Sequence, residues 1–108
     1  MQHVVTLTKP KIIFSSHSTK NTVNAVAQKC DFVKEVVLIE PAEKNGQETI
    51  QSLTKDIREG DVENFEPAII RDIKERDVLI MCSSGTTGLP KGVLLTHYNV
   101  LATFELYA

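Results

Sequence analysis

The chain has 108 residues, a length that fits one domain of common size. Hydrophobic residues make up 42% and charged residues 24% of it, a balance typical of a globular segment and unlike that of a disordered one. The formal net charge is −2 without a lysine or arginine cluster, which argues against nucleic acid or an anionic membrane as a partner. No apolar run approaches the ~20 residues of a transmembrane helix, and the N-terminus lacks the features of a signal peptide.

The first elements are short. Residues 4–7 fit either a strand or the end of a helix, and Pro10 stops a helix there. Residues 11–15 predict a strand, after which Ser18 or Thr19 is suited to cap a helix. The apolar face of this helix is formed at helical spacing by Val23, Val26, Ala27 and Cys30.

The next part predicts a second strand and a second helix. The run at 36–39 has the pattern of a fully buried strand that ends at Pro41. Asn45-Gly46 indicates a turn. An apolar face then recurs at helical spacing, and Gly60 is placed to terminate that helix. The residues of this face are Ile50, Leu53 and Ile57.

Residues 60–77 are charged, contain a proline and predict a loop with at most a short turn. Asp77 then begins a strand, and Thr96 is suited to cap a last helix. One side of that helix carries Val100, Leu101, Phe104 and Tyr107. Alternating strands and helices predict an α/β fold with parallel pairing in the first part, followed by an antiparallel strand–loop–strand hairpin and a helix.

The hairpin loop carries the strongest functional signal. Two apolar runs, at 78–81 and 93–95, predict buried strands on either side of it. Residues 82–92 hold four hydroxyl side chains, three glycines and one lysine between them. Hydroxyl and backbone N–H donors, close backbone approach at glycine and one positive charge suit a phosphate. On composition alone, a Gly/Ser/Thr loop without a ligand is an equal alternative.

The full pattern resembles the AMP-binding signature of the adenylate-forming enzymes, which include acyl-CoA synthetases, 4-coumarate–CoA ligases and insect luciferases. The residues that carry the resemblance are Ser83-Ser84-Gly85-Thr86-Thr87-Gly88-Leu89-Pro90-Lys91-Gly92-Val93, followed by Leu95-Thr96-His97. The stretch from Lys9 to Ser16 is similar to the luciferase-like and coumarate ligase-like branch. The loop differs from the GxxxxGK[ST] phosphate loop, because its glycines are too close together and its lysine precedes a glycine.

The resemblance implies that ATP, with Mg²⁺, activates a carboxylic acid as an acyl-adenylate, which is then transferred to coenzyme A. The predicted phosphate ligands are Ser83, Ser84, Gly85, Thr86, Thr87, Gly88 and Lys91. No catalytic residue is assigned, and the metal ligands are not identified because no carboxylate lies in or beside the loop. His97 is interpreted as a helix-start histidine rather than a substrate contact, and Tyr98 and Phe104 as core or interface residues.

The two cysteines, Cys30 and Cys82, have no metal-binding spacing and are predicted to be buried free thiols in a reducing compartment. His3 and His17 show no partner spacing and are expected at the surface.

By resemblance, residues 1–108 are expected to be a fragment of the large N-terminal domain of a longer enzyme, with the rest of that domain and a C-terminal domain missing. The expected location is intracellular, cytoplasmic or peroxisomal. The alternatives are a truncated, non-catalytic remnant that binds a nucleotide or a partner, and a fragment of a luciferase-like monooxygenase.

Overall fold

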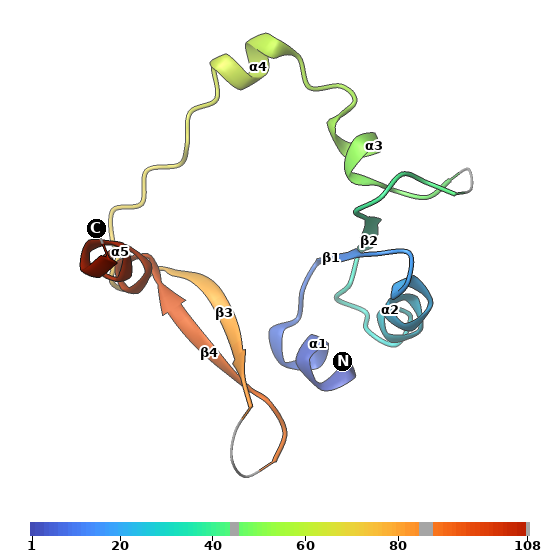
Figure 1. The fold of residues 1–108 in the computed structure, drawn as a ribbon, viewed down its shortest axis with the longest axis horizontal. Coiled ribbons are helices and arrows are strands. Elements are labelled where there is room, and N and C mark those ends of the chain that lie inside the picture. Colours follow the sequence, from blue (N-terminus) through green and yellow to red (C-terminus); the bar gives the residue numbers. More distant parts are fainter. Residues whose placement is uncertain (44–45, 85–87, 108) are drawn as a thin grey trace. The chain divides into compact units, whose positions relative to one another are not determined.

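The computed structural model describes residues 1–43, 46–84 and 88–107. The chain divides into two compact units, Met1–Phe65 and Glu66–Ala108, and each is described separately. Their elements are labelled in Figure 1.

The first unit is built around a two-stranded parallel sheet. Helix α1 (Gln2–Thr8) precedes strand β1 (Ile12–Ser15), and helix α2 (Lys20–Ala27) connects it to β2 (Glu35–Leu38). The register runs from Ile12 opposite Glu35 to Ser15 opposite Leu38. The predicted parallel pairing is confirmed, and the ambiguous pattern at residues 4–7 is a helix.

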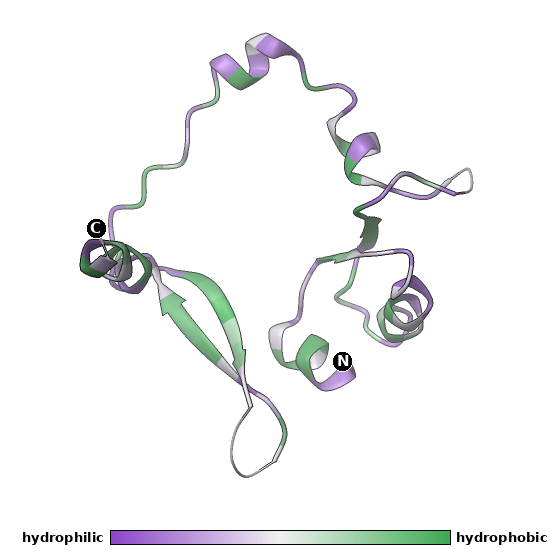
Figure 2. Cartoon of the chain, in the orientation of Figure 1, coloured by the Kyte–Doolittle hydropathy of each residue, from purple (hydrophilic) through white to green (hydrophobic). Residues whose placement is uncertain are grey.

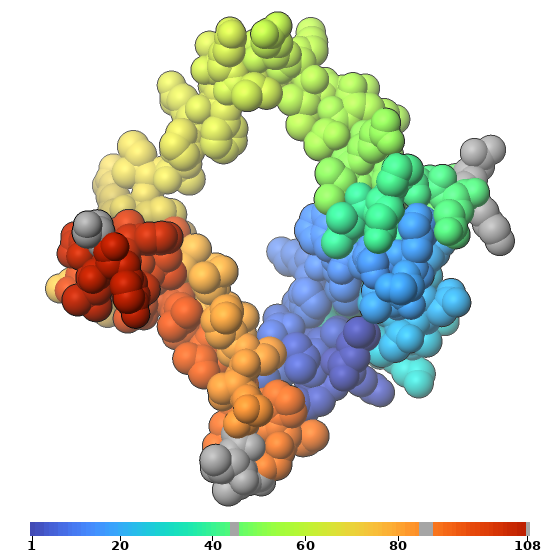
Figure 3. Space-filling view, in the orientation of Figure 1, coloured from blue at the N-terminus to red at the C-terminus, as the bar shows by residue number. Residues whose placement is uncertain are grey.

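A small core forms where this sheet meets the helices. The buried apolar side chains are Val5, Val23, Cys30, Val37 and Leu38. Val37 and Leu38 are the largest side chains that are fully buried among the described residues. The atoms of α1, β1 and α2, blue to cyan in Figure 3, form a continuous mass around it. The strand predicted at 36–39 lies one residue earlier, and Ile39 follows it with 55% of its surface exposed. Only its last two residues are buried, so the prediction of a fully buried strand is wrong.

Two short helices follow, α3 (Ile50–Thr54) and α4 (Glu59–Glu63). Thr49 caps α3 through its side chain, which accepts a hydrogen bond from the N–H of Ser52 at 3.0 Å. The prediction that Gly60 terminates a helix is wrong, because α3 already ends at Thr54 and Gly60 lies inside α4. The Asp61 carboxylate accepts a hydrogen bond from the N–H of Arg58 at 2.9 Å, which starts α4 just before Gly60.

The second unit consists of β3 (Asp77–Ser83), β4 (Lys91–Thr96) and α5 (His97–Tyr107). The two strands form the predicted antiparallel hairpin, and α5 follows β4 directly. Figure 2 shows that both strands are hydrophobic along most of their length.

The predicted burial of these strands is wrong for this chain. Every residue of β3 is exposed, including Cys82, which was expected to be a buried thiol. Residues 78–81 are apolar at four successive positions, a pattern that normally belongs to a strand covered on both faces. No described residue of the second unit is buried, so these faces have no cover within that unit.

Candidate functional site

The candidate site lies at the connected end of the β3–β4 hairpin. The antiparallel ladder pairs Cys82 with Gly92 and Ser83 with Lys91. Ser83 is the last residue of β3, and Lys91 is the first residue of β4. The register therefore brings the first and last predicted phosphate ligands opposite each other.

The predicted ligands are only partly in the described chain. Ser83, Ser84, Gly88 and Lys91 are described and exposed, whereas Gly85, Thr86 and Thr87 lie outside the described residues. Gly88 has a φ of 147°, a conformation that residues with a side chain rarely adopt. A glycine at this position is therefore required by the backbone, whichever ligand the loop takes.

The donors at this end suit an anion with several oxygens. Serine hydroxyls donate neutral hydrogen bonds, and the ammonium group of Lys91 adds charge-assisted ones, which are roughly twice as strong. Lys91 is the only cationic residue between Val78 and Leu95. The described residues contain no group of three or more His, Cys, Asp or Glu side chains that could hold a metal ion.

The start of helix α5 is a second place where a phosphate could be sought, but its donors are already used. The N–H groups of His97 and Tyr98 donate to the carbonyls of Arg76 and Ile73 at 3.0 and 2.9 Å. The N–H of Asn99 donates to Thr96 Oγ1 at 3.2 Å, and the N–H of Thr96 donates to Asn99 Oδ1 at 3.0 Å. All four N–H groups that begin a helix are therefore bonded within the chain, which leaves the hairpin loop as the better anion site.

These contacts also bear on two sequence interpretations. Thr96 caps the last helix, as its position predicted. The backbone of His97 is bonded at the helix start, which agrees with a structural role for this residue. Sequence reasoning missed Asn99, although the spacing Thr-x-x-Asn resembles a capping box and is a usable signal.

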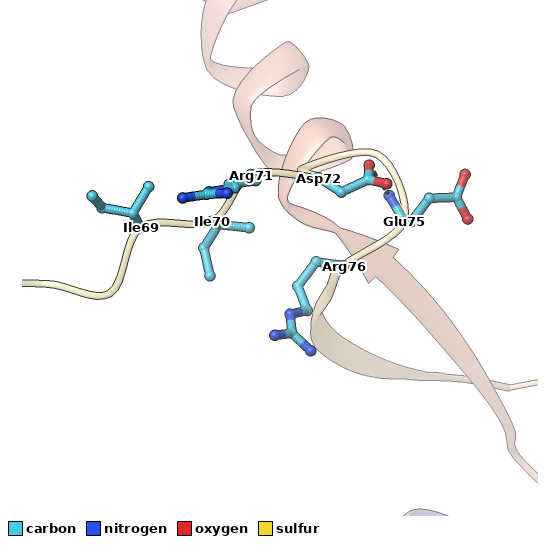
Figure 4. Close-up of a pocket in the computed structure, with 6 residues that line it drawn as sticks. All are labelled: Ile69, Ile70, Arg71, Asp72, Glu75 and Arg76. Carbon is cyan, nitrogen blue, oxygen red and sulfur yellow. Dashed lines mark hydrogen bonds between the residues drawn. The ribbon is translucent and has the colours of Figure 1, made fainter.

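An open hollow in the segment before β3 is a weaker candidate. Figure 4 shows the residues that line it, which are Ile69, Ile70, Arg71, Asp72, Glu75 and Arg76. The guanidinium groups of Arg71 and Arg76 point in different directions, and two carboxylates accompany them. Because two positive and two negative side chains line the hollow and do not converge, it has no strong electrostatic potential of one sign that would attract a charged ligand.

His17 belongs to the first unit and differs from its expected surface position. Its side chain is 26% exposed, and Nε2 lies 2.9 Å from the carbonyl oxygen of Pro41. Its backbone N–H donates to a Glu40 carboxylate oxygen at 3.1 Å. These contacts join the turn after β1 to the segment after β2, which is a structural role.

Comparison with known proteins shows the family of the chain. The model of the family described as AMP-binding enzyme matches residues 1–108. The chain is 37% identical over 109 residues to a luciferin 4-monooxygenase of Photuris pensylvanica, an alignment that covers 95% of this chain and 19% of that protein. A stretch of 36 residues is 64% identical to 4-coumarate–CoA ligase-like 6 of Arabidopsis thaliana and covers 32% of this chain and 6% of that protein. The solved structure of a natural red emitting luciferase from Phrixothrix hirtus matches with a TM-score of 0.81 and 34% identity, over 96% of this chain and 20% of that one.

A parallel βα unit followed by a hairpin with a Gly/Ser/Thr loop thus defines a part of an adenylate-forming enzyme. The chain belongs to the AMP-binding enzyme family. It spans about one fifth of the length of the luciferases that it matches. The resemblance predicted from the signature is confirmed, as are the α/β fold and the similarity to both luciferases and CoA ligases. Among the described helices, none is long and apolar enough to cross a membrane.

Proposed function

We propose that this chain supplies the phosphate-binding hairpin of an enzyme that uses ATP to activate a carboxylic acid and then transfers the acyl group to coenzyme A. The observation that carries the proposal is the register of β3 and β4, which sets Ser83 opposite Lys91 at the mouth of the loop. A cation and hydroxyl donors lie at one end of the ladder, where a polyphosphate can contact them together. Residues 1–108 form part of the N-terminal adenylation domain, and ATP, a carboxylic acid and coenzyme A are the partners.

The first step is a substitution at phosphorus. A carboxylate oxygen of the acid attacks the α-phosphorus of ATP, and the bond between this phosphorus and the bridging oxygen breaks. Pyrophosphate leaves with the electron pair of that bond. Its charge grows as it departs, so donors fixed around the β- and γ-phosphates stabilise the transition state. We assign this role to Lys91 together with Ser83, Ser84, Thr86 and Thr87, while Gly85 and Gly88 allow the backbone to approach.

The second step transfers the acyl group. The thiol of coenzyme A attacks the acyl carbonyl, the thiol proton passes to solvent, and AMP leaves with the electrons of the mixed-anhydride bond. A luciferase-like oxygenation of the adenylate is the second candidate, because this chain is similar to a protein named luciferin 4-monooxygenase. Incubating the complete enzyme with ATP and candidate acids separates the two, since one yields a thioester in the presence of coenzyme A and the other emits light with oxygen. Either activity would be expected in the cytoplasm or the peroxisome.

The test of the phosphate role is Lys91→Ala in the complete enzyme that carries this segment. Removing a charged contact to a transferring phosphoryl group typically costs ~10²-fold in rate. We expect pyrophosphate exchange to fall by about this factor, with the KM for the acid nearly unchanged. Lys91→Arg should restore part of the rate, because a planar guanidinium does not replace a compact ammonium ion.

Lys55→Ala is a matched control, since it removes an exposed lysine at the end of α3, an element that is not part of the hairpin. It should leave exchange unchanged. Exchange within about threefold of wild type in Lys91→Ala, or a rise in the KM for the acid alone, would contradict the role assigned to Lys91.

A further inference from the structure

The register of the β3–β4 hairpin is not fixed by its apolar pattern. Strand register is normally determined by alternation, because a slip of one residue moves apolar side chains from the core to solvent. Here β3 is apolar at four successive positions, 78–81, and β4 at three, 93–95. A slipped ladder would therefore pair apolar residues as well as the observed one does.

The length of the connection does not favour one register either. Tight two-residue turns determine the register of a hairpin through their geometry. The connection between these strands is longer, at residues 84–90, and so is not a turn of that kind. The register must then be determined at the other end of the hairpin, where β3 begins and β4 ends.

That end holds a reciprocal pair of side chains, which we name the Thr96–Asn99 clasp. Asn99 Oδ1 accepts hydrogen bonds from the Thr96 N–H at 3.0 Å and from Thr96 Oγ1 at 2.9 Å. In return, Thr96 Oγ1 accepts a hydrogen bond from the Asn99 N–H at 3.2 Å. The clasp fixes the last residue of β4 to the first turn of α5.

The same turn of α5 is bonded to the segment that leads into β3. The N–H groups of His97 and Tyr98 donate to the carbonyls of Arg76 and Ile73, and the Lys74 ammonium lies 5.2 Å from the centre of the Tyr98 ring. The first pair of the ladder, Asp77 opposite Thr96, follows immediately, and the next pair is Leu79 opposite Leu95, with a register shift between Asp77 and Leu79. Both strands are thus tied to one helical turn, so their relative position is defined there.

From this geometry we infer that the Thr96–Asn99 clasp sets the register of the hairpin and thereby places Lys91 opposite Ser83. Asn99 and Thr96 are positioning residues, because Thr96 lies about 17 Å along β4 from Lys91 at ~3.4 Å per residue. A slip of one residue would turn Lys91 to the opposite face of the sheet, and a slip of two would shift it by about 7 Å. The consequence for catalysis rests on the proposed function, whereas the control of register does not.

A disulfide reports the register in the 108-residue chain. Directly opposed residues of an antiparallel ladder have Cα atoms about 4.5–5.5 Å apart, within the range of a disulfide. Ile80 and Leu94 are such a pair, so the reporter is Ile80→Cys with Leu94→Cys in a Cys82→Ala background. We expect the 80–94 disulfide to form readily with Asn99 present. Its yield under equal oxidation should fall at least about fivefold in Asn99→Ala and in Thr96→Val, which keeps the shape of threonine without its hydroxyl.

Two variants serve as controls on the same helix. Asn99→Asp keeps an oxygen that accepts both hydrogen bonds and should restore the yield. Thr103→Ala removes an exposed hydroxyl that bonds only to the Asn99 carbonyl at 2.9 Å and should leave the yield unchanged. An unchanged yield in both Asn99→Ala and Thr96→Val would overturn the inference.

The catalytic consequence is measured by pyrophosphate exchange in the complete enzyme. Asn99→Ala should lower kcat about tenfold, and Asn99→Asp should recover it to within about threefold. In a Lys91→Ala background, Asn99→Ala should have almost no further effect, because it acts through the position of Lys91.

The outcomes separate this inference from the proposed function. An equal loss of rate from Asn99→Ala with and without Lys91 would overturn the positioning role. Normal exchange in Lys91→Ala alone would overturn the proposed function, and the disulfide yield would still decide whether the clasp sets the register.

Discussion

The two units of the chain are stabilised in different ways. The first unit, Met1–Phe65, buries a small apolar core in which Val37 is fully enclosed. The second unit, Glu66–Ala108, has no buried residue in its described part, and apolar side chains such as Ile80 and Leu94 remain 46% and 57% exposed. The candidate site thus belongs to the unit that is held by backbone hydrogen bonds and by the clasp rather than by a core.

The hairpin of the second unit thus has a defined backbone geometry but little stability of its own. A hairpin alone is at most marginally stable in water, since stability requires an apolar face to be covered. The relatives are about five times longer than this chain, and in proteins of that length we expect other residues to supply that cover. The chain alone should therefore be marginally stable, with no cooperative unfolding transition above ~60 °C.

The largest expected effect is a core substitution in the first unit. Leu38 is 2% exposed, and replacing it with alanine should lower the free energy of unfolding by about 2–5 kcal/mol. That is comparable with the whole stability of a small unit, so its cooperative transition should disappear. Leu94→Ala is the matched substitution in β4 and should change the stability of the 108-residue chain by less than about 1 kcal/mol. Urea denaturation followed by circular dichroism measures both. Equal losses would contradict the described difference between the units.

Hydrogen exchange should show an intermediate effect in the unmodified chain. The N–H of Leu38 donates to Glu48 at 2.8 Å and that of Ile39 donates to Ser15 at 3.0 Å, both beside the core. The bonded amides of the β3–β4 ladder lie in exposed strands. Because local opening requires less free energy where fewer apolar contacts break, we expect the ladder amides to exchange at least about tenfold faster. Equal protection measured by NMR would show that the hairpin has a cover within the chain.

The same contrast explains what could be predicted from the sequence. Apolar runs and caps indicated the parallel strands, the hairpin and the Thr96 cap, because these depend on residues close together in the chain. The burial of residues 78–81 was predicted wrongly, since an apolar pattern indicates that a strand needs a cover but not whether the chain contains it. The signature identified the family but not the Thr96–Asn99 clasp, because only the Thr96 half of the Thr-x-x-Asn spacing was interpreted.

Contacts between segments that are distant in the chain also could not be predicted from the sequence. His17 meets Pro41 across 24 positions, and no spacing rule predicts such a pair. Gly60 was misjudged because glycine often ends helices, yet here the Asp61 carboxylate bonds to the N–H of Arg58 and starts a short exposed helix. In both cases a specific polar contact decided the structure.

The smallest expected effect concerns the other reciprocal cap, at the start of α3. Thr49 Oγ1 accepts a hydrogen bond from the Ser52 N–H at 3.0 Å, and Ser52 Oγ accepts one from the Thr49 N–H at 2.8 Å. This cap resembles the Thr96–Asn99 clasp, but Thr49 is buried and bridges to Leu38 in the core. Comparing the two caps therefore tests whether a helix cap contributes more to the free energy of unfolding when it is buried beside a core.

Thr49→Ala should lower the free energy of unfolding of the first unit by about 1 kcal/mol, the usual cost of losing a cap. Thr49→Ser keeps the oxygen and should lose less. Thr54→Ala is the matched control, because its exposed hydroxyl bonds to the carbonyls of Ile50 and Gln51 within the same helix, at 3.0 and 3.4 Å. Its effect should stay within about 0.5 kcal/mol. Asn99→Ala should likewise leave this unfolding transition unchanged. The Thr96–Asn99 clasp lies in the second unit, where we expect it to affect the register of the β3–β4 hairpin. If Asn99→Ala instead destabilised the first unit as much as Thr49→Ala does, the two units would unfold together, and the separation of core and site drawn from their burial would be wrong.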